Sequence, residues 1–253
     1  MVETDVFISG AGLAGSIAAL SYSKAGRNVV VADPYIYGNN AQIDYRTTAY
    51  LQPSKLFLEK LGIWEAIEDS AMPLEIMKIM DSSNIKNGDK IRSQKEFKSA
   101  EISDLPFGWN VKNSLMRAAL KRLIDQQSNC KLITNSSVVD MVCRDSLAYL
   151  KLSSGNTVKA KLVIAADGRN SILREKAGIS TKTHRFGQKA LAFAVTHSIS
   201  HKNISTEIHN SGGPFTLVPL PDNEGKPSSA IVWMENGEKA KNLMEMETKS
   251  FER

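Results

Sequence analysis

The 253-residue sequence predicts an α/β fold in which a parallel-sheet domain is interrupted by a smaller β-rich portion. Two observations carry this prediction. The first 33 residues contain an apolar run, a glycine-rich turn, a helical pattern and a second apolar run, which is the order of a βαβ unit. Further along, residues 161–166 (KLVIAA) form the continuous apolar run typical of a strand buried on both faces of a parallel sheet.

Composition is that of a soluble globular protein, with 42% apolar and 23% charged residues and a net charge of +5. No apolar stretch approaches the ~18 residues that a membrane-spanning helix needs. The acidic start lacks a secretory signal, so we expect a cytoplasmic chain. Cys130 and Cys143 have no metal-ligand or disulfide spacing and are expected to be buried thiols. We interpret the basic stretch 86–98 as a solvated hairpin and not as a nucleic-acid-binding site.

The first βαβ unit is predicted as a strand over 4–9, a helix up to Ala25 and a strand over 28–32. Leu13, Ile17 and Leu20, with small alanines beside them, would form the buried stripe of the helix. The turn between the first strand and the helix has the Gly-x-Gly-x-x-Gly spacing, which in this context is typical of a Rossmann-like dinucleotide-binding domain.

Each glycine of this turn has a predicted task. Gly10 allows the tight turn, Gly12 lets a pyrophosphate approach the backbone, and Gly15 permits close helix packing. The turn residues proposed to contact a cofactor are Gly10, Ala11, Gly12, Leu13, Ala14 and Gly15. Asp33 ends the second strand, where an acid accepts hydrogen bonds from an adenosine ribose and disfavours a 2′-phosphate. NAD and FAD both remain open at this point.

Two further helices are predicted, over 49–61 and over 110–127, each with an apolar stripe. The first stripe consists of Leu51, Leu56, Phe57, Leu58 and Leu61. Arg46 precedes the first helix, where its guanidinium could hold a phosphate or ribityl oxygen, or equally form a salt bridge at the surface.

A β-meander is predicted next, with strands over 138–143, 147–152 and 157–159. It leads into the apolar run 161–166, which ends at Asp167-Gly168 and a short helix capped by Asn170 or Ser171. An acid at the carboxyl end of such a strand lies where open α/β sheets bind ligands.

The remaining segments are β-rich. We expect a nucleotide-binding domain of residues 1–72 and 105–184, and a substrate sheet made where 73–104 meets 185–236. Residues 237–253 look like the start of an unfinished helical segment.

An ordered set of motifs resembles the aromatic-ring flavoprotein monooxygenases, which are p-hydroxybenzoate hydroxylase-like, and within them the ubiquinone-biosynthesis hydroxylase branch. The set consists of Gly10-x-Gly12-x-x-Gly15, Asp33, Asp44-x-Arg46, Asn113 to Met116 at a helix start, Asp167 to Ser171 with Arg174, and Gly213 to Phe215 followed by Leu217 to Pro221. The resemblance covers essentially the whole chain.

The resemblance implies one FAD, held by the glycine turn, Asp33, Arg46, Asn113, Asp167 and Gly168, with NAD(P)H as a transient reductant. A flavin hydroperoxide would then hydroxylate an electron-rich phenol with O2, so that no side-chain nucleophile and no metal is required. A polyprenylated phenol would imply association with the periphery of the inner membrane or with a biosynthetic complex. No catalytic residue is assigned.

The sequence departs from the family in one respect: we expect a truncated chain, because family members continue to a further Gly-Asp motif and closing helices. Two alternatives therefore stay open. One is a flavoprotein reductase or halogenase on the same scaffold, and the other is a catalytically inactive FAD-binding fragment. A plain NAD dehydrogenase is disfavoured, because the Asp167-Gly168 element has no evident task there.

Overall fold

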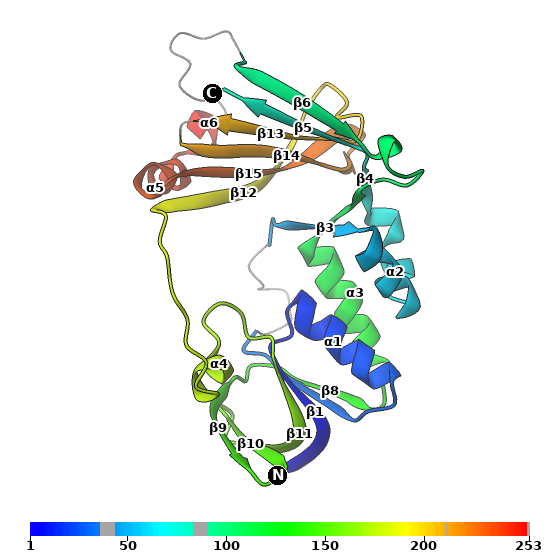
Figure 1. Cartoon of the computed structure of the whole chain (residues 1–253), viewed down its shortest axis with the longest axis vertical. Coiled ribbons are helices and arrows are strands. Elements are labelled where there is room, and N and C mark those ends of the chain that lie inside the picture. The colour runs from blue at the N-terminus through cyan, green and yellow to red at the C-terminus, as the bar shows by residue number, and fades with distance from the viewer. Residues whose placement is uncertain (36–43, 83–90, 211, 252–253) are drawn as a thin grey trace. The chain divides into compact units, whose positions relative to one another are not determined.

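The computed structural model describes residues 1–35, 44–82, 91–210 and 212–251 (Figure 1). They form two compact units. The first consists of Met1–Ile43, Leu58–Ala66 and Leu115–Lys182, and the second of Asp44–Phe57, Ile67–Ser114 and Thr183–Arg253. Part of the expected solvated hairpin, residues 86–90, and part of the expected turn-rich stretch, residues 36–43, lie outside the described residues.

The first unit is built on a six-stranded sheet in the order β8-β2-β1-β11-β10-β9. Its strands are β1 (Val2–Ser9), β2 (Val29–Ala32), β8 (Cys130–Ile133), β9 (Val138–Arg144), β10 (Leu147–Leu152) and β11 (Thr157–Ala165). The four strands β8, β2, β1 and β11 run parallel, and β10 and β9 continue the sheet antiparallel. Helix α1 (Leu13–Lys24) packs on β1 and β2, and α4 (Ile172–Lys176) packs on β9.

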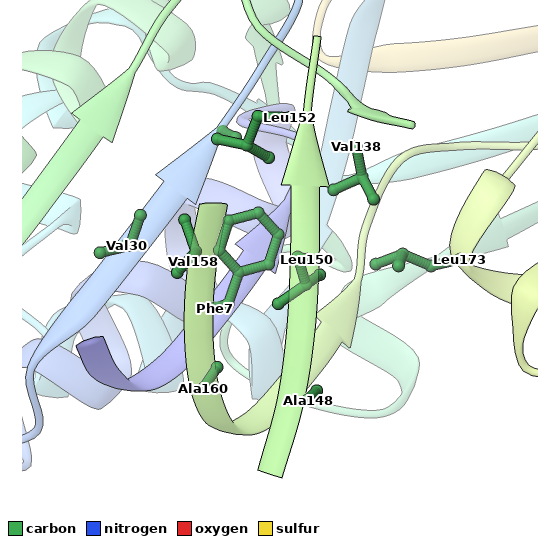
Figure 2. Close-up of a cluster of buried hydrophobic side chains, with 10 residues drawn as sticks. Phe7, Val30, Val138, Ala148, Leu150, Leu152, Val158, Ala160 and Leu173 are labelled. Atoms are coloured by element: carbon green, nitrogen blue, oxygen red, sulfur yellow. The ribbon is translucent and has the colours of Figure 1, made fainter. Parts of the chain in front are cut away.

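The core of this sheet brings together side chains from the βαβ unit and from the meander. Phe7 and Leu150 are fully buried, and Leu173 of α4 belongs to the same cluster (Figure 2). The rest of the cluster consists of Val30, Ala32, Val138, Ala148, Leu152, Val158 and Ala160. Because these residues come from segments far apart in the chain, the meander and the βαβ unit are expected to unfold together.

The second unit contains a six-stranded sheet in the order β12-β15-β14-β13-β5-β6. Its strands are β5 (Ile76–Asp81), β6 (Ser93–Lys98), β12 (Gln188–Thr196), β13 (Ile204–Asn210), β14 (Gly213–Asn223) and β15 (Lys226–Asn236). The only parallel pair among these described strands is β5 with β13. The hairpin arms β5 and β6 therefore share one sheet with the strands after residue 185.

A three-stranded antiparallel sheet, β3-β7-β4, also belongs to the second unit. Its strands are β3 (Thr47–Leu51), β4 (Met72–Leu74) and β7 (Gly108–Lys112). The remaining helices are α2 (Gln52–Lys60), α3 (Asn113–Asp125), α5 (Gly237–Glu245), α6 (Thr248–Phe251) and the short 3-10 helices η1 (Trp64–Ala66), η2 (Glu68–Ser70) and η3 (Ser99–Glu101). In the described part of the chain, no helix is both long and apolar enough to cross a membrane.

The predicted starts of two helices are wrong. The residues before α2 and α3 instead form β3 and β7, which pair with each other. Tyr50 and Val111 are buried in these strands. A helical stripe read from local spacing cannot reveal a strand partner about sixty residues away, and this pairing overrides the local pattern. Of the predicted apolar stripe, Leu58 and Leu61 are buried, whereas Leu51, Leu56 and Phe57 are exposed.

Three other expectations are corrected. The strand over 157–159 and the run 161–166 form one strand, β11, and the short strand β8 was not predicted. Cys143 is exposed, because β9 is an edge strand of its sheet. Helix α1 buries mainly the small residues Gly15, Ser16 and Ala19 together with Leu20, because a close approach to the sheet requires small side chains.

The run 161–166 is not buried on both faces as expected. Leu162 is 44% exposed, and Lys161 and Ala165 are exposed as well. The reason is that β10 pairs with only the first half of β11.

Candidate cofactor site

A cavity of about 320 Å³ lies in the first unit, at the carboxyl ends of parallel strands. Three turns line it, one after each of β1, β2 and β11. The lining residues are Ser9, Gly10, Gly12, Asp33, Pro34, Arg117, Ser137, Val138, Ala166, Asp167, Gly168, Asn170 and Ile172. The glycine turn and the Asp167 turn, predicted separately, thus meet at one site of the kind where open α/β sheets bind ligands.

The three glycines of the first turn have different surroundings. Gly10 has a φ of +97°, and a Cβ there would overlap the carbonyl oxygen of Ala166. A Cβ on Gly15 would overlap the carbonyl oxygen of Gly10. In contrast, a Cβ on Gly12 would have no atom within 4 Å. Gly10 and Gly15 are therefore required by packing, whereas Gly12 leaves open space at the cavity.

Helix α1 begins at this open glycine. Gly12 is the N-cap residue, no side chain caps the helix, and no acidic residue occupies its first turn. The first backbone N–H groups of a helix have no partner within the helix, and the dipole makes this end positive. The start of α1 therefore favours an anionic group such as a phosphate.

Asp33 holds the glycine turn in place. Its Oδ2 accepts a hydrogen bond from the Ala11 backbone N–H at 2.5 Å, and its Oδ1 accepts one from the Tyr35 N–H at 2.7 Å. A carboxylate has about four acceptor positions, so two of them remain for ligand hydroxyls. The sequence predicted the ligand-facing role of Asp33 and missed this bracing role, because Ala11 approaches Asp33 only in the folded turn.

Asp167 has one oxygen fixed and one without a partner. Its Oδ2 accepts hydrogen bonds from the backbone N–H groups of Ile172 at 3.0 Å and Leu173 at 3.3 Å. Its Oδ1 is buried and has no hydrogen-bond partner among the described residues. A buried acceptor without a donor is costly, so this atom indicates a donor that the polypeptide itself does not supply. The neighbouring Gly168 has a φ of +84°, which suits glycine.

The other two predicted site residues belong to the second unit. Arg46 makes a forked pair of hydrogen bonds, both 2.8 Å, to the Asp44 carboxylate, and this pair raises the pKa of the arginine. The structure thus shows the salt-bridge alternative for Arg46. Asn113 is buried at the start of α3, where its Oδ1 accepts a hydrogen bond from the Thr48 hydroxyl at 2.7 Å. Their contribution to a cofactor site remains a prediction.

Arg117 and Ser137 line the cavity but were not predicted. A signal for Arg117 existed, since it lies four residues after Asn113 and hence on the same face of the helix. Ser137 carries no motif, and only the packing of the meander against the βαβ unit places it at the cavity.

The sequence matches the family described as FAD binding domain over residues 3–251, so the chain belongs to this family. Membership identifies FAD as the cofactor and confirms the predicted resemblance and the α/β fold class.

Among its relatives, ubiquinone hydroxylase UbiL of Rhodospirillum rubrum is 28% identical over 98% of this chain and 56% of its own length. The 3-demethoxyubiquinol 3-hydroxylase of Escherichia coli is 26% identical over 96% of this chain and 60% of its own length. The chain therefore spans a little more than half the length of these relatives. The solved structure of p-nitrophenol 4-monooxygenase PnpA from Pseudomonas putida has a similar fold, with a TM-score of 0.77 at 17% identity, covering 96% of this chain and 62% of that one.

The residues of the cavity fit part of an FAD molecule. The open space at Gly12 and the positive end of α1 suit a pyrophosphate. The unpartnered Oδ1 of Asp167 suits a hydroxyl donor. At about 320 Å³ the cavity is at the small end of ligand pockets, so it would hold a portion of the cofactor rather than all of it.

Proposed function

We propose that this chain is the FAD-binding and substrate-sheet part of a monooxygenase that hydroxylates an electron-rich, polyprenylated phenol of ubiquinone biosynthesis, using O2 and NAD(P)H. The observation that carries the proposal is the single cavity lined by both the glycine turn and the Asp167 turn. The names of the two hydroxylase relatives support the choice of substrate class.

In this proposal each part of the cavity binds a different portion of FAD. The turn 10–15 and the start of α1 bind the pyrophosphate, and Asp33 accepts hydrogen bonds from the adenosine ribose. Asp167 Oδ1 accepts a hydrogen bond from a hydroxyl of the cofactor, beside Gly168. Arg46 and Asn113 complete the set. Bound FAD would supply redox chemistry that no amino-acid side chain provides, accepting hydride from NAD(P)H and activating O2.

The polypeptide then contributes binding, orientation and exclusion of water. We assign 1–72 and 105–184 to FAD binding, and the sheet of 73–104 and 185–236 to the phenol. A polyprenyl tail partitions into a bilayer, so the chain would work in the cytoplasm at the surface of the inner membrane, alone or within a biosynthetic complex. The positive net charge of +5 is compatible with an anionic membrane surface.

The first experiment measures FAD binding by visible absorption and calorimetry. We expect flavin bands at near-stoichiometric occupancy in the wild-type chain. Asp167→Asn should weaken FAD binding by about tenfold, or ~1.4 kcal/mol, because an amide nitrogen would replace the unpartnered acceptor. Asp125→Asn is the matched control, since Asp125 is on α3 with a 52% exposed side chain and does not line the cavity. Equal FAD affinity in both variants would contradict the assigned role of Asp167.

The second experiment identifies the reaction. The chain is incubated with FAD, NADH, O2 and a polyprenyl phenol, and the products are analysed by mass spectrometry. A new ring hydroxyl supports hydroxylation, whereas saturation of a double bond would indicate a reductase. Bound FAD without any product would favour the FAD-binding fragment over a complete enzyme.

A further inference from the structure

A histidine and a glutamate form a pair on one face of the second sheet. Glu207 and His209 of β13 are two residues apart, so their side chains point to the same face. Nε2 of His209 lies 2.8 Å from Oε1 of Glu207, and the His209 and Glu207 side chains are 48% and 35% exposed. Because an ionised carboxylate only accepts hydrogen bonds, Nε2 of the neutral ring carries the proton in this pair. The other ring nitrogen, Nδ1, is then the basic atom, and none of the described residues is bonded to it.

The two other histidines beside this sheet have no ring nitrogen left for a ligand. Both nitrogens of His197 are within hydrogen-bond distance of a partner, the Ile199 carbonyl oxygen at 2.6 Å and the Ser229 hydroxyl at 3.0 Å. Both nitrogens of His201 are likewise bonded to backbone groups. His209 therefore differs from them in offering an accessible base.

The surroundings of the pair combine a hydroxyl group with exposed apolar side chains. Glu207 is paired in register with Thr216 of β14 and with Ile79 of β5, and residues paired in this way share a face of the sheet. On the same face, Met77 of β5 is paired with Phe97 of β6, and these side chains are 44% and 43% exposed. We call this side of the sheet the Glu207 face. Its exposed apolar side chains suit an aromatic ring that carries an apolar tail.

The opposite face of the same sheet is partly covered by the chain itself. The ring centroids of Phe251 in α6 and Trp233 in β15 are 6.3 Å apart. Trp233 is paired with Phe215, which precedes Thr216 in β14, so Trp233 points away from the Glu207 face. The face with the accessible base is thus not the face on which α6 lies.

We propose that His209 is the base that accepts the phenol proton of the substrate, and that Glu207 is a positioning residue for its ring. The inference rests on the proposed function, because it places the phenol of that reaction on the Glu207 face. Asp81, the register partner of His209 on β5, forms an ion pair with Arg92 at 3.7 Å. Glu207 is therefore the carboxylate assigned to the imidazole.

The proposed step is a proton transfer without any change of oxidation state. The O–H bond of the phenol breaks and an N–H bond forms at Nδ1 of His209, which gives a phenolate and an imidazolium cation. Glu207 holds the ring through Nε2 and stabilises the cation that forms, as carboxylates do in histidine-carboxylate pairs. The negative charge of a phenolate is shared with its ring carbons, so deprotonation makes the ring more reactive toward an electrophilic oxygen.

The test uses the whole chain without FAD and two phenol probes. The first is p-nitrophenol, whose phenolate form is yellow and whose phenol form is colourless. The second is 2-prenylphenol, which is titrated into ¹⁵N-histidine-labelled chain while the imidazole ¹⁵N shifts are recorded. At a pH where the free probes are mainly neutral phenols, we expect a phenolate band and a shift of the His209 Nδ1 signal to the protonated position.

Variants identify the residue that is responsible. His209→Gln should reduce the bound phenolate at least about tenfold, and Glu207→Gln should reduce it to a smaller extent. His184→Gln is the matched control, because His184 is exposed in the linker before β12 and lies outside the sheet. Since the His209 side chain is 48% exposed, its replacement should leave Tm nearly unchanged in circular dichroism melts. The ¹⁵N measurement on the wild-type chain does not depend on any variant.

Three results would overturn the proposal. Probes that bind entirely as phenols, with an unchanged His209 signal, would exclude this histidine as the base. Equal phenolate formation in the His209→Gln and His184→Gln variants would assign the proton acceptor elsewhere. Absence of binding by both probes up to their solubility limits would remove the phenol from the Glu207 face. Because neither probe experiment contains FAD, the FAD titrations described above decide the cofactor role independently.

Discussion

The different surroundings of the three glycines allow folding and cofactor binding to be separated by single substitutions. Gly12 has a φ of −65° and a ψ of −177°, which alanine adopts without strain, and its added Cβ would meet no atom within 4 Å. A Cβ on Gly15 would overlap a backbone carbonyl oxygen. Gly12→Ala should therefore fold normally and lose FAD affinity, whereas Gly15→Ala should lose stability.

The expected magnitudes follow from these surroundings. Alanine at a compatible glycine position stabilises by about 0.4–1 kcal/mol through the unfolded state, so Gly12→Ala should melt at or slightly above the wild-type temperature. Overpacking typically costs about 1–3 kcal/mol, and for a chain of this size each kcal/mol lowers Tm by roughly 2–4 °C. Gly15→Ala should thus melt about 2–12 °C lower. A methyl group at the pyrophosphate position should weaken FAD binding by at least about tenfold, or ~1.4 kcal/mol.

The assay combines thermal melts without FAD, followed by circular dichroism, with calorimetric titration of FAD. A Gly12→Ala variant that melts normally and binds FAD within twofold of wild type would refute the idea that the pyrophosphate approaches this glycine. A Gly12→Ala variant that melts well below wild type would show instead that the space at Gly12 is needed for folding.

Three other predictions concern single side chains. Asp33→Asn should lower stability by about 1–3 kcal/mol in denaturant melts, since an amide oxygen cannot replace both carboxylate acceptors; an unchanged midpoint would contradict the bracing role. Iodoacetamide at pH 8 should modify exposed Cys143 well before Cys130, because burial raises the pKa of Cys130 to about 11; equal rates by peptide mass spectrometry would disprove this. Hydrogen bonding from Lys239 lowers the pKa of buried Glu235 below its ordinary 4.5. The ionised Glu235 therefore stabilises the fold fully above pH 4.5, and this stabilisation is lost as the pH falls through the lowered pKa. In the Glu235→Gln variant, Tm should therefore fall less steeply with decreasing pH than in the wild type. An equally steep fall of Tm in both proteins would contradict this role of Glu235.

Local signals were sufficient for the strands and the turn of the βαβ unit and for the first two strands of the meander. The glycine turn, the second strand and Asp33 form a short-range series in which spacing and residue type agree. Ser171 likewise caps α4 as predicted, accepting a hydrogen bond from the Arg174 N–H at 3.0 Å. In these segments the local preference and the tertiary environment favour the same structure.

The errors arise where distant pairing decides the structure. Residues 49–51 were included in the helix predicted over 49–61, yet they belong to β3, because β3 pairs with β7. The exposure of Leu162 and Ala165 has the same kind of cause. A sequence pattern indicates which environment suits a strand, but it does not show which neighbours the strand has in the fold. The cavity residues Arg117 and Ser137 could not be predicted as a pair, because only the folded first unit brings them to one place.

The hydrogen bonds of the two site carboxylates explain why this cavity would require little reorganisation on binding. Two backbone N–H groups hold Asp33, and two others hold one oxygen of Asp167, so neither side chain has to lose rotamer freedom when a ligand arrives. Fixing a free carboxylate would otherwise cost binding free energy, at about 0.5–1.5 kcal/mol for each immobilised side chain. Because one donor to Asp33 comes from the glycine turn and both donors to Asp167 come from α4, a change in either element should reach the cofactor through these carboxylates.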